Sequence, residues 1–343
     1  MPRILKRILT SVIISIVIYL GIAFGLSYFG GPKPEAVNQE GAEKRGDVVN
    51  SGINFSEMML DYAGMPSLQS YGTRGQGQLQ YRYYSSDSDK VLILLHGSGW
   101  HSQQFYQLAK FISEQGLAQV YTPDLRGHGV NPQRRGDIDY IGQFEDDLAD
   151  LILGIKQDSP KSDIIMGGHS SGGGLAIRFA GGKYGKQADA YLLLAPFIFY
   201  NAPTTRPNAG GWATPYTARI IGLSMLNNIG IHGLNDLTSI KFNMPQTFRN
   251  GTETLAYSYR LNTSFAPRDY EDDLSAISQP LLVLAGADDE TMFAEQYQPV
   301  ITQHIPDNKQ AQVEVLPGVS HMGVVVSPDV RPVIQAWIEG LRL

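Results

Sequence analysis

Residues 164–177 have the sequence IIMGGHSSGGGLAI. The first three form a short apolar run typical of a buried strand, and the small residues at the other end are typical of a helix that starts close to a sheet. The turn between them, Gly168-His169-Ser170-Ser171-Gly172, has the pattern Gly-x-Ser-x-Gly. On a sharp strand-to-helix turn the serine stands above the sheet in a strained backbone, and its neighbours must be small because larger groups would collide. We therefore predict that Ser170 is a nucleophile; the alternative is a serine in an ordinary glycine-rich connection.

Other parts of the chain show the same alternation of apolar runs and amphipathic segments. The further runs predicted as strands are Leu79–Tyr84, Val91–Leu95, Gln119–Thr122, Tyr191–Leu194, Leu281–Leu284 and Val313–Leu316. One predicted helix has apolar residues at three- and four-residue spacing, namely Phe144, Leu148, Leu151, Ile152 and Ile155. A last helix is predicted for Val330–Leu341. This order predicts the α/β class, with a mostly parallel central sheet and helices on both faces.

One long segment, residues 198–273, interrupts the alternation. It lies between two predicted strands and is far longer than an ordinary loop, so we expect it to have structure of its own or to act as a lid. Short helices are predicted at Ala218–Leu226 and Leu255–Leu261. Its aromatic residues suit the wall of an apolar pocket; they are Trp212, Tyr216, Phe242, Phe248, Tyr257 and Tyr259.

The N-terminal residues indicate a membrane segment. Arg3, Lys6 and Arg7 precede the uncharged, apolar stretch Ile8–Phe29, which is long enough to cross a hydrocarbon core of about 30 Å as a helix. The basic flank predicts a cytoplasmic N-terminus and an extracytoplasmic main domain. A cleaved signal peptide is the alternative, although the stretch is longer than the apolar part of most signal peptides. The predicted organisation is a transmembrane signal anchor in residues 1–30, a flexible tether in residues 31–51 and a globular domain in residues 52–343.

A serine hydroxyl needs a base within hydrogen-bond distance to be an effective nucleophile. Of the seven histidines, His321 is predicted to be that base, because it comes just after the last predicted strand. His96 and His128 lie in glycine-containing turns and are interpreted as structural hydrogen-bonding residues. His304 is interpreted as an ordinary residue of a helix. His169, next to the nucleophile, is expected to point away from it.

The base in turn needs an acidic partner that fixes its tautomer. The strand Leu281–Leu284 is followed by Ala285-Gly286-Ala287-Asp288-Asp289-Glu290, which supplies three candidates. The connection after Tyr191–Leu194 contains no acid and is excluded as the source of this partner. On chain position alone, Asp288, Asp289 and Glu290 all stay open.

Backbone N–H groups are expected to stabilise the oxyanion of a tetrahedral intermediate. One should come from Ser171, the residue after the nucleophile. The other should come from His96-Gly97-Ser98-Gly99, directly after Val91–Leu95, with Ser98 as the preferred donor. Glycines in this turn allow the backbone to approach a substrate closely.

Two further motifs carry a resemblance to a known family. Asp124-Leu125-Arg126-Gly127-His128-Gly129 follows a predicted strand, and Gly286 and Asp289 have the spacing Gly-x-x-Asp. Together with the turn around Ser170, they resemble the α/β-hydrolase superfamily from about residue 79 to residue 343. They look most like its lysophospholipase and monoacylglycerol lipase branch.

The resemblance implies a Ser170, Asp289, His321 triad in this chain order and selects Asp289 over Asp288. It also implies an α/β-hydrolase fold with a lid over an acyl pocket, and residues 198–273 fit that lid, although they contain no motif that defines a substrate. The Asp124–Gly129 motif is structural in the family and is given no catalytic role. Epoxide hydrolases and dehalogenases have an aspartate where this chain has Ser170, which argues against those activities.

Composition excludes several other classes of function. The net charge of −6 argues against nucleic-acid binding, and the lack of cysteine excludes disulfides and thiolate chemistry. No metal-ligand spacing or dinucleotide fingerprint is present, so no cofactor is predicted. The predicted function is a membrane-anchored serine hydrolase acting on a small-molecule or lipid ester. The alternatives are an aminopeptidase or acyltransferase with the same triad, or a non-catalytic binding protein of the same fold. Oligomeric state stays open.

Overall fold

A mostly parallel sheet forms the centre of the molecule. The computed structural model describes residues 3–32, 52–75, 77–306 and 308–343, and its main sheet has the strand order β1-β2-β4-β3-β5-β6-β10-β11. β1 and β2 pair antiparallel with their neighbours, while all pairs from β4 to β11 are parallel. The strands are β1 (Leu68–Thr73), β2 (Gly77–Tyr84), β3 (Lys90–Leu95), β4 (Gln119–Asp124), β5 (Asp163–His169), β6 (Ala190–Leu194), β10 (Leu281–Gly286) and β11 (Ala311–Leu316).

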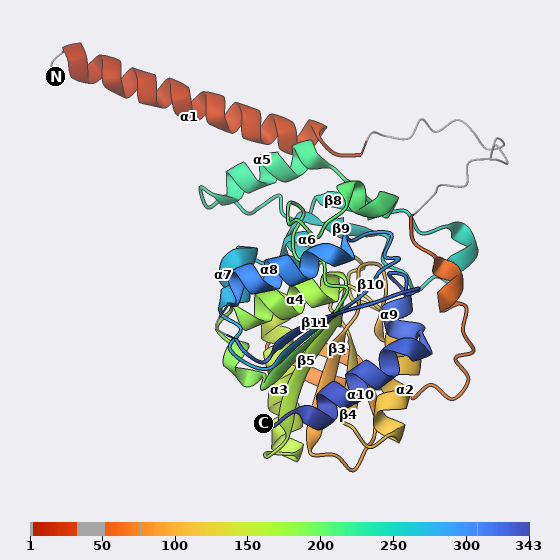
Figure 1. Cartoon of the computed structure of the whole chain (residues 1–343). Helices are drawn as coiled ribbons and strands as arrows, with labels where there is room; N and C mark the ends of the chain where they lie inside the picture. The colour runs from red at the N-terminus through yellow and green to blue at the C-terminus, as the bar shows by residue number, and fades with distance from the viewer. Residues whose placement is uncertain (1–2, 33–51, 76, 307) are drawn as a thin grey trace.

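Helices cover both faces of this sheet (Figure 1). One face carries α2 (Tyr106–Glu114), α9 (Gly323–Val326) and α10 (Arg331–Gly340), which pack on one another. The other carries α3 (Gln143–Asp158), α4 (Ser171–Ala180), α7 (Tyr270–Ser275) and α8 (Tyr297–His304). The predicted fold class and every predicted strand are thus confirmed. β1 was not predicted, because this half-exposed edge strand is rich in polar residues and has no apolar run.

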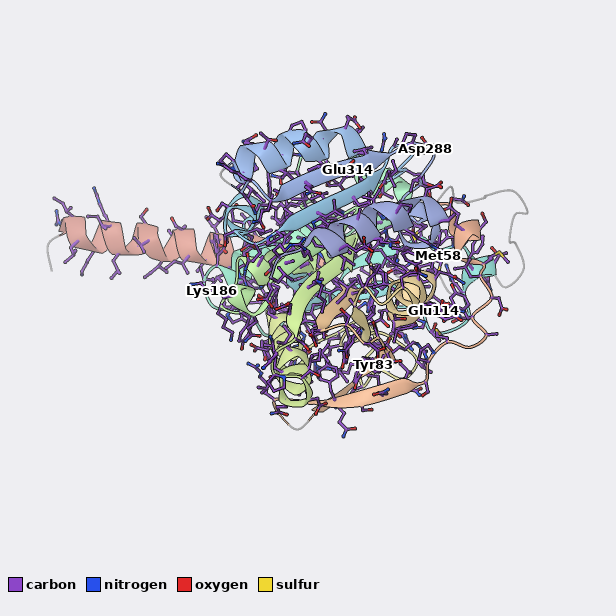
Figure 2. All side chains as sticks on the ribbon, turned by 60° about the horizontal axis from the view of Figure 1, so that its bottom comes forward. Met58, Tyr83, Glu114, Lys186, Asp288 and Glu314 are labelled. Carbon is purple, nitrogen blue, oxygen red and sulfur yellow. The ribbon has the colours of Figure 1, made fainter. Side chains whose placement is uncertain are left out.

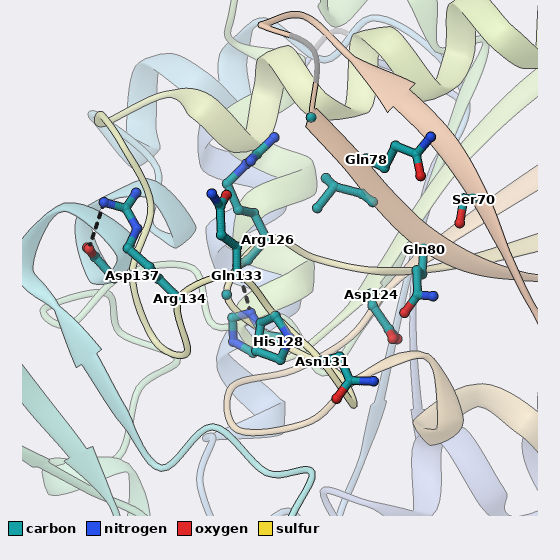
Figure 3. Close-up of a pocket in the computed structure, with 14 residues that line it drawn as sticks. Ser70, Gln78, Gln80, Asp124, Arg126, His128, Asn131, Gln133, Arg134 and Asp137 are labelled. Atoms are coloured by element: carbon teal, nitrogen blue, oxygen red, sulfur yellow. Dashed lines mark hydrogen bonds and ion pairs between the residues drawn. The ribbon is translucent and has the colours of Figure 1, made fainter.

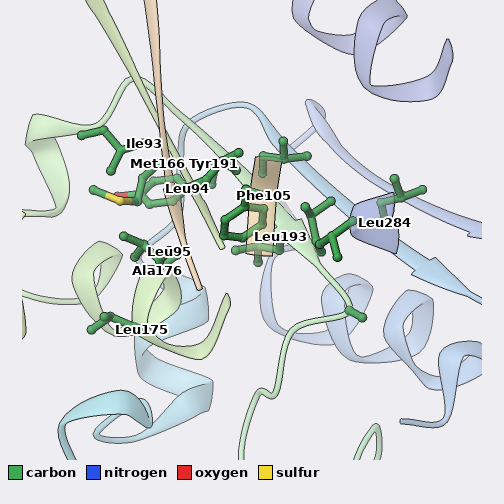
Figure 4. Packing of buried hydrophobic residues seen from close by; sticks show 14 of the residues in the cluster. Ile93, Leu94, Leu95, Phe105, Met166, Leu175, Ala176, Tyr191, Leu193 and Leu284 are labelled. Atoms are coloured by element: carbon green, nitrogen blue, oxygen red, sulfur yellow. The ribbon is translucent and has the colours of Figure 1, made fainter. Parts of the chain in front are cut away.

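The central strands are apolar on both sides because helices cover both faces. Residues 91–95 of β3 and 191–194 of β6 are fully buried. Figure 4 shows Ile93, Leu94 and Leu95 of β3 and Tyr191 and Leu193 of β6 in the same packed cluster as Phe105 and the α4 residues Leu175 and Ala176. Each buried leucine or isoleucine contributes about 1.5–3 kcal/mol to folding. The result is a rigid platform for the loops at the carboxyl ends of the strands, where ligands bind in open α/β sheets.

The long segment between β6 and β10 forms a small unit of its own. It contains β7 (Ala213–Pro215), α5 (Thr217–Asn227), β8 (Thr238–Phe242), β9 (Ala256–Ser258) and α6 (Tyr259–Phe265). The three strands form a second, antiparallel sheet in the order β7-β8-β9. This insertion lies on the same side of the domain as α1 (Arg3–Phe29) (Figure 1).

The two helices predicted in the insertion have different outcomes. Helix α5 confirms the prediction for 218–226. The prediction of one helix over 255–261 is wrong in its first half, because residues 256–258 are strand β9. The Ser258 side chain accepts a hydrogen bond from Leu261 N at 3.2 Å and so starts α6 immediately after the strand.

Helix α1 is long and apolar enough to cross a membrane. It projects from the domain, and its side chains extend freely over most of its length (Figure 2). Of its residues, Ala23 and Ser27 are buried, both where the helix meets α5. A membrane anchor and a signal sequence share these properties. The tether predicted for residues 31–51 lies almost wholly outside the described residues.

Candidate active site

Ser170 lies on the turn between β5 and α4, in a conformation that few residues other than glycine adopt. Its φ and ψ angles are 52° and −119°, a strain of about 1–3 kcal/mol that the surrounding structure must hold in place. A Cβ atom on Gly168 would lie 2.2 Å from the Gly172 carbonyl oxygen, and one on Gly172 would lie 2.0 Å from the Leu95 oxygen. Both glycines are therefore required by close backbone approach, as the Gly-x-Ser-x-Gly pattern predicts.

His321 and Asp289 come together from the ends of two neighbouring strands. Asp289 follows β10 and His321 follows β11, and the Asp289 Oδ2 atom lies 2.8 Å from His321 Nδ1. Both residues are buried, each with 2% of its surface exposed. The other carboxylate oxygen, Oδ1, accepts hydrogen bonds from the backbone N–H groups of Thr291 and Met292, each at 2.8 Å. The acid is thus fixed by backbone donors and directed at the ring.

The surroundings of Asp289 keep its carboxyl group ionised. Burial alone would raise the pKa of Asp289, but the interaction with His321 and the N–H groups of Thr291 and Met292 outweigh burial and lower it. An ionised carboxylate only accepts hydrogen bonds, so His321 Nδ1 carries the proton. His321 Nε2 is then left as an acceptor, which is the form a general base requires.

His169, the residue before Ser170, holds the backbone of His321 in place. Its Nε2–H donates to the His321 carbonyl oxygen at 2.9 Å, and its Nδ1 accepts from the Gln104 side-chain amide at 2.9 Å. The two imidazole rings have centroids 4.6 Å apart. Burial lowers the pKa of His169 to about 3, so the ring is neutral at physiological pH. His169 is thus engaged away from Ser170, as predicted; its support of His321 was not predicted.

His321 is held beside the turn that carries Ser170, without a direct bond to the Ser170 hydroxyl. His321 is tied to the residue immediately before Ser170, yet among the described residues no hydrogen bond joins the Ser170 hydroxyl to the His321 ring. Such bonds are often long in structures without substrate and shorten in the complex.

Two backbone donors next to Ser170 are free. The N–H of Ser171 begins helix α4, and that of Ser98 lies in the turn after β3; within the described ranges neither has an acceptor. In the same turn, the Gly97 N–H donates to Gln104 Oε1 and the Gly99 N–H donates to the Tyr257 hydroxyl. Ser98 is therefore the member of this glycine-rich turn whose N–H stays available to a substrate.

Two aromatic residues of the insertion form hydrogen bonds with the Ser98–Gly99 turn. The Trp212 indole N–H donates to Ser98 Oγ at 3.0 Å, and the Tyr257 hydroxyl accepts the Gly99 N–H at 2.7 Å. The Tyr257 hydroxyl in turn donates to His128 Nε2 at 2.7 Å. His128 can accept this bond because burial lowers its pKa to about 3 and keeps its ring neutral. Its other nitrogen, Nδ1, donates to the Arg126 carbonyl oxygen. From the sequence, Trp212 and Tyr257 were expected only to line a pocket, and their hydrogen bonds to this turn were not predicted.

We expect Tyr257→Phe to lower kcat for a p-nitrophenyl ester by about tenfold, since losing a whole oxyanion donor costs about 100- to 1,000-fold and this change only loosens the support of one. KM should change little. Tyr259→Phe is the matched control, because the Tyr259 hydroxyl contacts Ser224 within the insertion. Steady-state kinetics compare the two variants with the parent chain. Equal kcat values for all three would contradict the supporting role of Tyr257.

A polar cavity of about 250 Å³ adjoins His128 (Figure 3). It is lined by Asp124, by residues 126–128 and 131–134 of the connection after β4, and by residues 77–80 of β2, and neither Ser170 nor His321 borders it. Elsewhere in the described parts of the chain, no three acidic or histidine side chains gather as metal ligands. The cavity is thus not assigned to the chemistry of Ser170.

Comparison with protein families fits this geometry. The family model described as serine aminopeptidase, S33 (Hydrolase_4), matches residues 86–324, a range that includes the Ser170 turn, Asp289 and His321. The chain belongs to this family. It is thereby an α/β-hydrolase and by class a serine hydrolase, in the branch that contains the monoglyceride lipases.

Named relatives of this S33-family chain include two lipases. The monoacylglycerol lipase of Mycolicibacterium smegmatis is 29% identical over 134 residues, 38% of this chain and 47% of that enzyme. Human monoglyceride lipase is 25% identical over 239 residues, 67% of this chain and 75% of the human protein. The match thus spans about half of the first enzyme and three quarters of the second.

Solved structures have the same fold. A soluble variant of monoglyceride lipase from Saccharomyces cerevisiae, in complex with a substrate analog, has a TM-score of 0.59 at 17% identity and covers 80% of this chain and 95% of its own. A thermophilic esterase from Thermogutta terrifontis has a TM-score of 0.53 at 22% identity, with coverages of 80% and 98%. At these identities the likeness concerns the fold alone.

Proposed function

We propose that this chain is a membrane-anchored hydrolase of carboxylic esters with Ser170 as nucleophile, His321 as base and Asp289 as the acid that orients His321. The observation that carries the proposal is the buried Asp289–His321 pair, fixed beside a strained Ser170 that has two free backbone N–H groups next to it. Each component of acyl transfer is then supplied by the chain itself.

The proposed reaction has two halves. Ser170 Oγ attacks the carbonyl carbon while its proton passes to His321 Nε2, and the oxyanion accepts hydrogen bonds from the Ser98 and Ser171 N–H groups. The intermediate collapses to an acyl-enzyme as the alcohol leaves with the proton from His321. Water then attacks the acyl carbon, gives its proton to His321, and Ser170 leaves with that proton as the acid is released.

The proposed substrates are lipid esters such as a monoacylglycerol or a lysophospholipid. Support comes from the names of the relatives, monoacylglycerol lipase and monoglyceride lipase, and from helix α1, which would keep the domain beside a bilayer. The basic residues Arg3, Lys6 and Arg7 favour a cytoplasmic N-terminus and an extracytoplasmic domain. Residues 198–273 would then be the lid through which an acyl chain reaches Ser170.

The family name keeps aminopeptidase activity as a second candidate. An aminopeptidase needs a free acidic group to bind the ammonium group of its substrate. Besides Asp289, two acidic side chains of the described structure accept hydrogen bonds from the His321 loop, and both are occupied. Glu290 accepts from the Asn54 and His321 N–H groups, and Glu57 accepts from the Ser320 hydroxyl. This arrangement favours the ester.

The test uses the full chain in vesicles of phosphatidylethanolamine and phosphatidylglycerol. The substrates are a vesicle-embedded monoacylglycerol, a lysophospholipid, a short water-soluble p-nitrophenyl ester and an aminoacyl p-nitroanilide. We expect release of fatty acid or nitrophenol from the esters, with the embedded monoacylglycerol preferred, and no release from the anilide. Faster cleavage of the anilide than of every ester would instead establish the aminopeptidase.

A further inference from the structure

Helix α1 contacts the catalytic domain through α5 of the insertion. Where the two helices meet, Ala23 and Ser27 of α1 are fully buried, and they lie one turn apart on the same face of α1. On the other helix, Ala218 and Gly222 have the same four-residue spacing. Pairs of small residues at this spacing let two helix backbones approach closely, as they do in membrane helix pairs.

The approach is so close that only glycine fits on α5 at its centre. A Cβ atom on Gly222 would lie 2.6 Å from both the Ala23 carbonyl oxygen and the Ser27 nitrogen. Gly30, just after α1, is under the same constraint, because its Cβ would lie 2.6 Å from the Arg219 nitrogen. Glycine also costs helix stability in the middle of α5, so the contact is a reason for its presence there.

Hydrogen bonds join α1 and α5 at both ends of their contact. The buried Arg219 side chain donates to the Ser27 carbonyl oxygen at 2.8 Å and to the Tyr28 oxygen at 3.3 Å; these carbonyls at the end of α1 have no partner within the helix. A further Arg219 nitrogen donates to the Thr238 oxygen of β8 at 2.9 Å. Further back along α1, the Tyr19 hydroxyl donates to the Met225 oxygen at 2.8 Å.

Helix length places this contact at the outer edge of the hydrocarbon. A hydrocarbon core about 30 Å thick takes up about 20 residues of a helix. Counted from Ile8, the first residue after the basic flank, these are residues 8–27, so Ala23 lies inside the core, Ser27 at its edge and Tyr28 just beyond it. α5 then lies at this edge, where its exposed Ile221 suits the boundary between headgroups and acyl chains.

We propose that α1 is retained in the mature protein and forms a fixed helix pair with α5, which keeps the insertion over Ser170 in contact with the bilayer. This inference rests on the membrane anchoring proposed above. It makes α1 part of the structure of the insertion, since removal of α1 would break two of the Arg219 hydrogen bonds and uncover the small-residue face of α5.

The test exploits the absence of cysteine from the chain. Single variants Ser27→Cys and Tyr28→Cys, in the full chain in vesicles of phosphatidylethanolamine and phosphatidylglycerol, are labelled with a polar maleimide. The two positions lie at nearly the same depth, but Ser27 is buried against α5 and Tyr28 is 56% exposed. We expect Ser27→Cys to react about tenfold more slowly than Tyr28→Cys, because reaction requires local opening of the helix pair. Equal rates would overturn the proposal.

A second substitution shows whether α5 causes the protection. Adding Gly222→Leu should raise the Ser27→Cys rate to that of Tyr28→Cys, while adding Ile221→Leu, on the exposed face of α5, should leave it slow. Protection that survives Gly222→Leu would overturn the helix pair, as would a membrane-derived chain whose mass shows that it begins after Phe29. The labelling is repeated with Ser170→Ala, so that an inactive enzyme, which would refute the proposed function, does not affect this result.

Discussion

Ser170→Ala is expected to lower kcat for a p-nitrophenyl ester by about 10⁴-fold or more, because removal of the nucleophile from a serine triad removes nearly all of its rate enhancement. The substitution deletes one oxygen at a residue that is 8% exposed, so the midpoint of thermal unfolding should stay close to that of the parent chain. Steady-state kinetics and thermal unfolding of the purified full chain measure the two quantities.

Ser239→Ala is the matched control for this substitution. Ser239 is also buried, and its hydroxyl has no hydrogen-bond partner in the described structure. Its removal therefore breaks no hydrogen bond, and kcat should remain within about twofold of the parent value. Substantial ester turnover by Ser170→Ala, with normal turnover by Ser239→Ala, would refute the role of Ser170.

Asp289→Asn is expected to lower kcat by about 10³- to 10⁴-fold, because an amide in place of the carboxylate stabilises the wrong tautomer of the base. In this chain the carboxylate accepts the His321 Nδ1–H at 2.8 Å and two backbone N–H groups besides. An asparagine can present an N–H to His321 Nδ1 and so move the proton to Nε2, where it blocks general-base catalysis.

Asp288→Asn is the control for Asp289→Asn, since the two residues are adjacent and differ in where their side chains point. Asp288 is exposed at the surface (Figure 2), whereas Asp289 is buried. Kinetics on the same ester should show near-parent kcat for Asp288→Asn. A larger loss from Asp288→Asn than from Asp289→Asn would contradict the assignment.

Much of the central sheet and of the Ser170 turn could be predicted because the signals are local. Apolar runs such as residues 91–95 are buried on both faces and stand out in composition, and the glycines around Ser170 are fixed by backbone contacts within one turn. His321 could be selected because its position after the last strand follows from strand order. Asp289 and Asp288 could not be separated by composition or position, since both are aspartates in the same loop, and the choice of Asp289 rested on the family resemblance.

Other features depend on contacts between distant segments. The strands β7 and β9 have three residues each, too short to show alternation. Trp212 and Tyr257 were recognised as aromatic, but their hydrogen bonds to the Ser98–Gly99 turn join segments more than 100 residues apart. Helices α1 and α5 likewise lie far apart in the sequence, and nothing near Gly222 in the sequence indicates that it packs against α1.

The most direct test of the proposed roles of Ser170 and His321 is the reaction of the full chain with a fluorophosphonate, followed by peptide mass analysis, in the parent chain and in His321→Ala. Only an activated serine reacts with this probe. We predict one adduct on the peptide that contains Ser170 in the parent chain, and loss of that adduct in His321→Ala. An adduct on a different residue, or equal labelling of Ser170 with and without His321, would contradict the account.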